Sequence, residues 1–288
     1  MTVDWERISE PQSDQYDSRV ILEMVGPQFK QQGPANGDDI RVFDNRVVCK
    51  PNTYWDAEEF PPVEANHPNV ALACELIGRW PPAFEQCQHL LSEILVSWWC
   101  GATSKTLGCS SGPGPSGFGS VCVTVFNPLG AAEGIVHELA HHKLRALGIQ
   151  VEAAEQFIIN SSAELYHSPI RYDKLRPMSA VLHAEYSYLH VAQLDINVAR
   201  SLKTKPEQRA IAAQALAIYL PKLEYGRSVI ENNIRLDGNG VAFLRGLLGW
   251  LEDVIRIGYC ILDDLEVPRV PFTHPLADKI GEEVPRIG

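Results

Sequence analysis

His137-Glu138-Leu139-Ala140-His141 is the stretch from which the fold of this 288-residue chain can be worked out. On an α-helix, residues four positions apart lie on the same face, so both imidazoles can reach one metal ion with Glu138 beside them. An accidental HExxH pattern is expected only roughly once in sixty chains of this composition. The spacing therefore predicts a helix that carries a metal site, with Glu138 in a catalytic position.

The residues around this stretch predict a strand that leads into the helix. Residues 121–126 form a short, apolar run rich in valine, which is typical of a buried strand. Asn127-Pro128 follows as a helix N-cap and first helical residue, and Gly148 is a C-cap glycine. Zinc-peptidase-like folds place a strand directly before an HExxH helix, and the edge of such a strand can pair with an extended peptide. The expected fold class is α+β and predominantly α-helical, with a zincin-like core and a helical C-terminal part.

Three regions are expected along the chain. Residues 1–66 form an irregular N-terminal segment with short strands at 40–49, residues 67–265 form the HExxH catalytic domain, and residues 266–288 form a proline-rich C-terminal tail. The Gly/Pro/Ser-rich residues 110–119 are predicted to be a mobile loop, which is a candidate lid or peptide-docking element. Apolar periodicity predicts further helices at 69–80, 83–99, 178–202, 207–232 and 241–262.

Composition argues against several classes of protein. The net charge of −11, from 25 basic and 36 acidic residues, argues against nucleic acid or an anionic membrane as the main partner. The most apolar stretch, 241–262, is interrupted by charged residues, and the N-terminus has no signal-peptide pattern. The seven cysteines are odd in number and form no CxxC pair, so reduced thiols are expected. We therefore expect a cytoplasmic enzyme without a membrane partner, and composition gives no oligomeric state.

A metal site needs at least one further protein ligand. A metzincin would continue the motif as HExxHxxGxxH, but Leu144 and Leu147 stand where that glycine and histidine belong. The next predicted helix offers His183 as the favoured third ligand, with Glu164 and Glu185 as alternatives. His183 could instead be a hydrogen-bonded core histidine.

Helical spacing also assigns directions to the neighbouring side chains. Tyr186 is predicted to share a face with His183, while Glu185 points away from that face. Three residues that follow the motif are expected to be exposed to solvent: His142, Lys143 and Arg145.

Residues 166–177, between the two helices, are rich in arginine, tyrosine and proline. Guanidinium groups match carboxylates bidentately, so Arg171 or Arg176 near a metal can bind the distal carboxylate of a dicarboxylic acid that chelates the ion. The alternative is an ion-paired surface loop, for example with Arg176 bound to Asp173.

Three separated motifs resemble the HExxH-type 2-oxoglutarate-dependent peptide β-hydroxylases, and the resemblance spans roughly residues 105–200. The motifs are Ile135-Val136-His137-Glu138-Leu139-Ala140-His141-His142-Lys143-Leu144, then Ser168-Pro169-Ile170-Arg171 with Arg176-Pro177, and Val181-Leu182-His183-Ala184-Glu185-Tyr186. The resemblance implies an Fe(II) enzyme that uses O2 and 2-oxoglutarate to hydroxylate a side-chain β-carbon of a ribosomally synthesised peptide. It implies iron on His137, His141 and His183. It also implies a 2-oxoglutarate site formed by Arg171 or Arg176 with Ser168 and Tyr186.

Two other functions stay open, because imidazole ligands suit iron and zinc alike. In a zinc metallopeptidase, Glu138 would deprotonate a Zn(II)-bound water that attacks a peptide carbonyl. In the oxygenase, Glu138 would instead orient the metal site. A peptide-binding protein with an inactive site is a third class, and the intact HExxH set argues against it.

Overall fold

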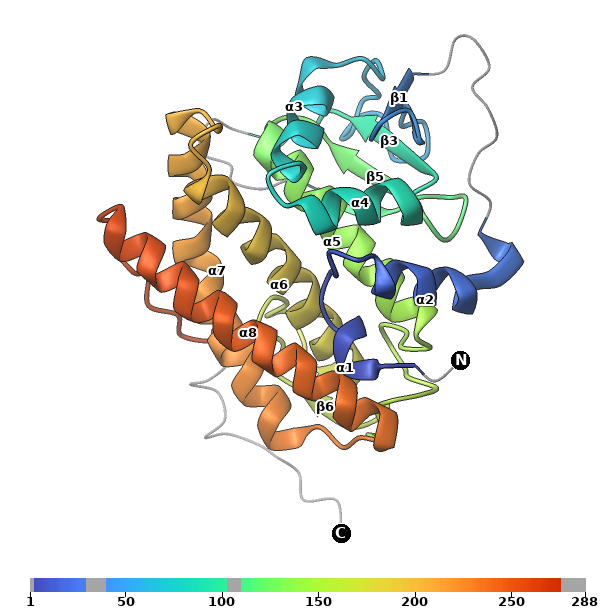
Figure 1. Cartoon of the computed structure of the whole chain (residues 1–288), viewed down its shortest axis with the longest axis vertical. Coiled ribbons are helices and arrows are strands. Elements are labelled where there is room, and N and C mark those ends of the chain that lie inside the picture. Colours follow the sequence, from blue (N-terminus) through green and yellow to red (C-terminus); the bar gives the residue numbers. More distant parts are fainter. Residues whose placement is uncertain (1–2, 30–39, 103–109, 276–288) are drawn as a thin grey trace.

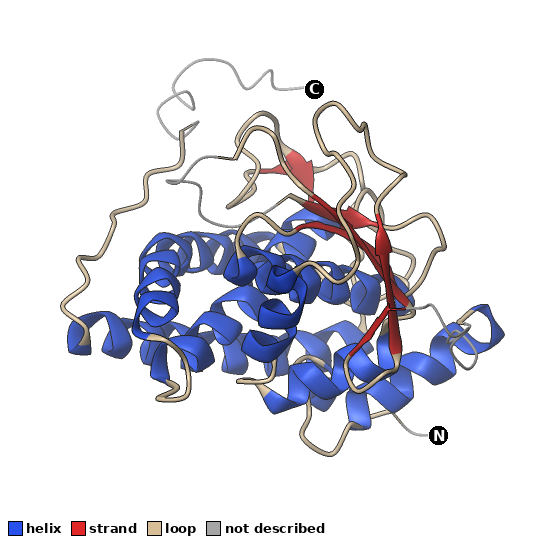
Figure 2. Ribbon diagram, turned by 90° about the horizontal axis from the view of Figure 1, so that it is seen from above, coloured by secondary structure: helices blue, strands red, loops and turns tan. Residues whose placement is uncertain are grey.

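The computed structural model describes residues 3–29, 40–102 and 110–275. Within these ranges the fold is mixed α/β: a five-stranded sheet packs against a set of long helices (Figure 1). Figure 2 shows the strands as one layer, with helices gathered on one side and long loops on the other. None of the described helices is both long enough and apolar enough to cross a membrane. Cys109 and the last part of the tail, 276–288, lie outside the described residues.

The sheet has the strand order β1-β2-β3-β5-β4. Strands β2, β3 and β5 run parallel to one another, and the edge strands β1 and β4 are antiparallel to their neighbours. All residues of β3 and β5 are buried, as is typical of parallel strands covered on both faces. The strands are β1 (Ile40–Val42), β2 (Val47–Pro51), β3 (Glu93–Ser97), β4 (Ser111–Pro113) and β5 (Ser120–Thr124).

The prediction of one helix over residues 83–99 is wrong. Helix α4 (Pro81–Leu90) ends early, and Glu93–Ser97 form β3 at the centre of the sheet. Periodicity cannot separate a short, fully buried strand from a buried helical segment, because both are continuous apolar runs. Pairing with β2 on one side and β5 on the other decides the outcome here.

The predicted mobile loop at 110–119 contains the edge strand β4. Because β4 pairs with β5, the strand before the HExxH helix has no open edge for a peptide. Among the described strands, the edge next to this helix is β4 instead.

The other long helices lie where periodicity predicts them. Asn127 caps the HExxH helix by accepting a hydrogen bond from the Leu129 N–H at 2.9 Å, and Gly148 beyond its end has a φ of +78°. This helix, α5, contacts both β5 and α6, so it lies between the sheet and the layer of α6, α7 and α8 (Figure 1). The bounds are α3 (Pro68–Ile77), α5 (Pro128–Ala146), α6 (Met178–Arg200), α7 (Pro206–Asn233) and α8 (Gly238–Asp264).

The N-terminal segment packs on the same core. Helix α1 (Trp5–Ile8) contacts α8, and α2 (Tyr16–Val25), which a short 3-10 turn follows at Gly26–Gln28, contacts α4 and α5. The predicted strand pair at 40–49 is confirmed as β1 and β2, and β2 continues the sheet through its parallel pairing with β3.

Two of the residues that follow the motif are buried, although they were predicted to be exposed to solvent. His142 is only 3% exposed, and its Nε2–H donates to the Ser120 carbonyl oxygen at 3.1 Å. Lys143 is 0% exposed, and its Nζ donates to an Asp17 carboxylate oxygen on α2 at 3.1 Å. Because α5 is enclosed by the sheet, α2, α3 and α6, most of its surface is covered, and helical periodicity alone cannot reveal a solvent face.

The described part of the C-terminal tail is also packed. His274 is buried, its Nε2–H donates to the Ser168 carbonyl oxygen at 3.1 Å, and its ring stacks on Tyr225 with centroids 5.1 Å apart. The loop after Ser168 is closed at its base by a small antiparallel ribbon of β6 (Leu165–Tyr166) and β7 (Arg176–Pro177). The tail therefore holds the loop that carries Arg171.

Candidate metal centre

His137 and His141 lie one turn apart on α5, and their Nε2 atoms are 3.1 Å apart. Two nitrogens bound to one ion at ~2.1 Å lie about 3.0–3.4 Å apart for octahedral or tetrahedral angles, so the observed spacing fits a single ion. A Glu138 carboxylate oxygen lies 4.0 Å from His137 Nε2. The ligand atoms of these three residues all lie within 4.8 Å of one another, so they form a group that could bind a metal ion.

His183 reaches the site, but it contacts the far side of the His141 ring. The two Nδ1 atoms are 2.7 Å apart and the rings stack with centroids 5.0 Å apart. The other ring nitrogen of His183, Nε2, lies 2.8 Å from the Ile149 carbonyl oxygen. A carbonyl only accepts, so Nε2 of His183 carries the proton.

This hydrogen-bond chain fixes the tautomer of His141. Burial lowers the pKa of His183 to about 4, so its ring is neutral near pH 7 and its Nδ1 accepts a hydrogen bond from the Nδ1–H of His141. His141 Nε2 then presents its lone pair toward His137. Metal-bound histidines commonly donate their second N–H in this way. In this geometry His183 orients His141, which differs from the predicted role of third ligand.

Burial also sets the protonation of the other groups. It lowers the pKa of His137 to about 4 and that of His141 well below its ordinary value. It raises the pKa of Glu138 to about 7, partly offset by the Ser111 hydroxyl, which donates to the carboxylate at 3.0 Å. Two neutral imidazoles beside a buried carboxyl group suit a divalent cation, because metal ligands must be deprotonated.

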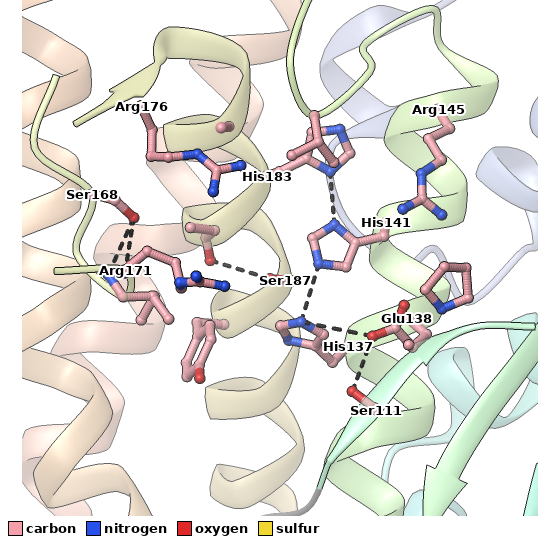
Figure 3. Close-up of a pocket in the computed structure, with 17 residues that line it drawn as sticks. Ser111, His137, Glu138, His141, Arg145, Ser168, Arg171, Arg176, His183 and Ser187 are labelled. Atoms are coloured by element: carbon pink, nitrogen blue, oxygen red, sulfur yellow. Dashed lines mark hydrogen bonds and ion pairs between the residues drawn. The ribbon is translucent and has the colours of Figure 1, made fainter. Parts of the chain in front are cut away.

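A pocket of about 320 Å³ opens in front of the imidazoles (Figure 3). Helix α6 lines it with the small side chains of Ala180, Ala184 and Ser187, which leave room beside the imidazoles. The ring of Tyr188 packs edge-on against His137, with centroids 5.4 Å apart. The remaining walls come from β4, the last turns of α5 and the loop between β6 and β7.

Arg171 and Arg176 both line this pocket, and each already has a carboxylate partner. Arg171 is 61% exposed and donates twice to Asp173, at 3.0 Å from Nε and 3.0 Å from Nη2. Arg176 is 12% exposed and donates from Nη2 to Glu152 at 2.5 Å. Asp173 thus pairs with Arg171, not with Arg176 as the surface-loop alternative supposed.

Ser168 also lines the pocket, but its hydroxyl serves the backbone. The Ser168 Oγ accepts the backbone N–H groups of Ile170 at 3.3 Å and Arg171 at 3.2 Å. The residue therefore shapes the turn that presents Arg171.

Tyr186 does not line the pocket, so its prediction as a cofactor contact requires correction. Its ring is fully buried against His190, with centroids 4.5 Å apart, and Lys143 Nζ lies 5.7 Å from its centroid. The face of α6 that borders the pocket carries Ala180, Ala184 and Ser187, whereas Tyr186 projects into the core.

The two alternative ligands also lie elsewhere. Glu164 accepts a hydrogen bond from Tyr166 at 2.9 Å and pairs with Arg235. Glu185 is buried against α7, where a side chain at Gly226 would collide with its carboxylate. Neither carboxylate lines the pocket, which argues against both as ligands.

Two pocket residues were not predicted from the motifs. Arg145 lines the pocket although it was expected to face solvent. A signal for it exists in the sequence, because His137, His141 and Arg145 are spaced four apart and so share a helix face. Ser111 carries no such local signal, since only the pairing of β4 with β5 brings it to Glu138.

A second acidic group lies on the same helices. Glu133 of α5 and Asp195 of α6 are both buried, and Tyr219 of α7 donates to Glu133 at 3.2 Å. Burial raises the pKa of Glu133 to about 7 and that of Asp195 well above its ordinary value, to which the charge of Glu133 also contributes.

Glu133→Gln is expected to reduce the fall in stability between pH 5 and pH 7. An unfolded glutamate loses its proton near pH 4.5, whereas buried Glu133 keeps it to about pH 7. The native state therefore binds more protons in this range, and its stability falls as the pH rises. Glutamine has no such proton to lose. Thermal midpoints at pH 5, 6 and 7 should shift in favour of the variant as the pH rises, and a pH-independent difference would contradict this account.

Comparison with family models and with curated proteins found no relative of this chain. No protein-family model matches the chain, and no curated protein is similar to it. Function must therefore be argued from the residues of the site themselves.

Proposed function

We propose that this chain is an Fe(II)- and 2-oxoglutarate-dependent dioxygenase that hydroxylates a side-chain β-carbon of a ribosomally synthesised peptide. The proposal rests on one observation: imidazoles spaced for one metal ion border the same pocket as three guanidinium groups. A dicarboxylic 2-oxo acid needs a metal at one end and a cation at the other, and this pocket offers both.

The donors present fit such an ion. His137 and His141 have neutral rings with Nε2 atoms at a suitable spacing, and Glu138 borders the pair closely enough to complete the set. With Glu138, the set would be the two histidines and one carboxylate that are typical of non-heme Fe(II) oxygenases. When bound, Fe(II) supplies the redox chemistry for O2 activation, with 2-oxoglutarate as co-substrate.

The sheet edge supports a peptide as the substrate. Ser111, Gly112 and Pro113 of β4 line the pocket, and among the described strands β4 is the edge next to the HExxH helix. An extended peptide paired with this edge would carry one of its side chains past the imidazoles. The succession of β5, the Asn127 cap and the HExxH helix, with β4 antiparallel at the edge, is in keeping with a zincin-like core.

The test is turnover of 2-oxoglutarate by protein loaded with Fe(II) under anaerobic conditions and then exposed to O2. We expect succinate to form, slowly without a peptide, and only when Fe(II), O2 and 2-oxoglutarate are all present. Protein loaded with Zn(II) is the matched control and should form none. Absence of succinate from fully Fe(II)-loaded protein, with metal content verified, would overturn the proposal.

One observation favours a zinc metallopeptidase as a second candidate. The pKa of Glu138 is raised by burial to about 7, beside the metal-binding pair, which suits a general base at neutral pH. This candidate predicts hydrolysis of labelled casein by the Zn(II) protein without 2-oxoglutarate. Glu138→Gln should then reduce hydrolysis by about 10²–10⁴-fold, the usual contribution of a general base.

A further inference from the structure

Arg145 is the pocket arginine closest along the chain to the metal-binding pair. It lies in the last turn of α5, one turn beyond His141, and its guanidinium is directed toward the pocket (Figure 3). It also borders a second pocket of about 380 Å³, which Pro113 lines as well. Burial raises the pKa of Glu138 and lowers that of His141. The charge of Arg145 lowers both pKa values, so it opposes the first shift and adds to the second.

The three arginines differ in what a ligand would have to displace. A carboxylate bound to Arg171 competes with both oxygens of Asp173, and one bound to Arg176 competes with Glu152. The guanidinium of Arg145 makes no ion pair or hydrogen bond with any residue in the described ranges. Among the described residues, a ligand carboxylate at Arg145 therefore displaces no ion pair of the guanidinium.

The helix also sets a suitable separation between metal and cation. Four residues of α-helix rise about 6 Å, so a group at His141 and a group at Arg145 lie about one diacid length apart on the same face. A five-carbon dicarboxylic acid can span this separation with one end on the metal.

We infer that Arg145, and neither Arg171 nor Arg176, binds the distal carboxylate of 2-oxoglutarate. The inference rests on the proposed function and assigns one residue within it. Ser168 and the ion-paired arginines then form the wall opposite α5.

The experiment measures ligand binding, so it does not depend on turnover. Calorimetric titration of Mn(II)-loaded protein with 2-oxoglutarate is compared with titration by pyruvate, which lacks the distal carboxylate. For Arg145→Gln we expect the Kd for 2-oxoglutarate to rise about 10- to 100-fold, as for loss of a charge-assisted hydrogen bond, while the Kd for pyruvate stays unchanged.

The controls remove each of the other arginines together with its own partner, so that no carboxylate is left unpaired. They are the double variants Arg171→Gln with Asp173→Asn, and Arg176→Gln with Glu152→Gln. Each should change the Kd for 2-oxoglutarate by less than about threefold. Metal content is measured in every variant, so that a weaker Kd is not mistaken for loss of Mn(II).

Two outcomes overturn the inference, and only the second also overturns the proposed function. If Arg145→Gln binds 2-oxoglutarate like the wild type while one double variant loses it, the anchor is the other arginine and the proposed function stands. If metal-loaded wild type binds neither 2-oxoglutarate nor pyruvate, the proposed function fails together with the inference.

Discussion

His141→Ala is expected to abolish metal binding, whereas His183→Ala should weaken it by about 10- to 100-fold. His141 presents Nε2 at 3.1 Å from His137 Nε2, so its removal leaves one imidazole at the centre. His183 contacts only the Nδ1 side of His141, so its loss frees the ring without removing a donor of the Nε2 pair. Titration with Co(II), followed by visible absorption and competition with a chelator, measures the metal affinity of the wild type and of each of the two variants.

A conservative substitution separates orientation from ligation at position 183. Glutamine can accept from His141 and donate to the Ile149 carbonyl, so His183→Gln should recover much of the affinity that alanine loses. His89→Ala on α4, outside the pocket, is the matched histidine control. If His183→Ala and His183→Gln both abolish binding as His141→Ala does, His183 is a ligand and its orienting role is wrong.

Lys143→Met is expected to destabilise the protein by about 3–5 kcal/mol, the usual cost of leaving one partner of a buried ion pair uncompensated. Lys143 and Asp17 are both fully buried, and their pair links α2 to the HExxH helix α5. Burial alone would lower the pKa of Lys143, but Tyr186 and Asp17 raise it by more than burial lowers it. The net pKa therefore lies above its ordinary value, and the amine stays charged. Urea unfolding followed by circular dichroism measures the change in the free energy of unfolding.

The second partner supplies the control. Adding Asp17→Asn to Lys143→Met removes the unpaired charge while keeping an oxygen for the Gln12 N–H, so the double variant should be more stable than Lys143→Met alone. Arg256→Met breaks the exposed pair with Asp253 and should leave the unfolding midpoint almost unchanged. A Lys143→Met variant as stable as Arg256→Met would show that the buried pair does not hold α2 in place.

Local sequence was enough to identify the HExxH helix and the strand and cap that precede it. The four-residue spacing of His137 and His141, the cap at Asn127 and the glycine at 148 act within one or two turns, so their outcome does not depend on distant contacts. The long helices α6, α7 and α8 follow from apolar periodicity in the same way. The function proposed from these motifs remains a prediction.

Contacts between distant segments settled the rest. Pairing with β2 and β5 turned residues 93–97 from predicted helix into the central strand, and the enclosure of α5 buried Lys143 against Asp17. Ser111 reaches Glu138 only because β4 closes the sheet edge. An amino-acid pattern encodes the preference of a segment for helix or strand. Which faces of that segment are buried depends on the segments that pack against it, and these come from elsewhere in the chain.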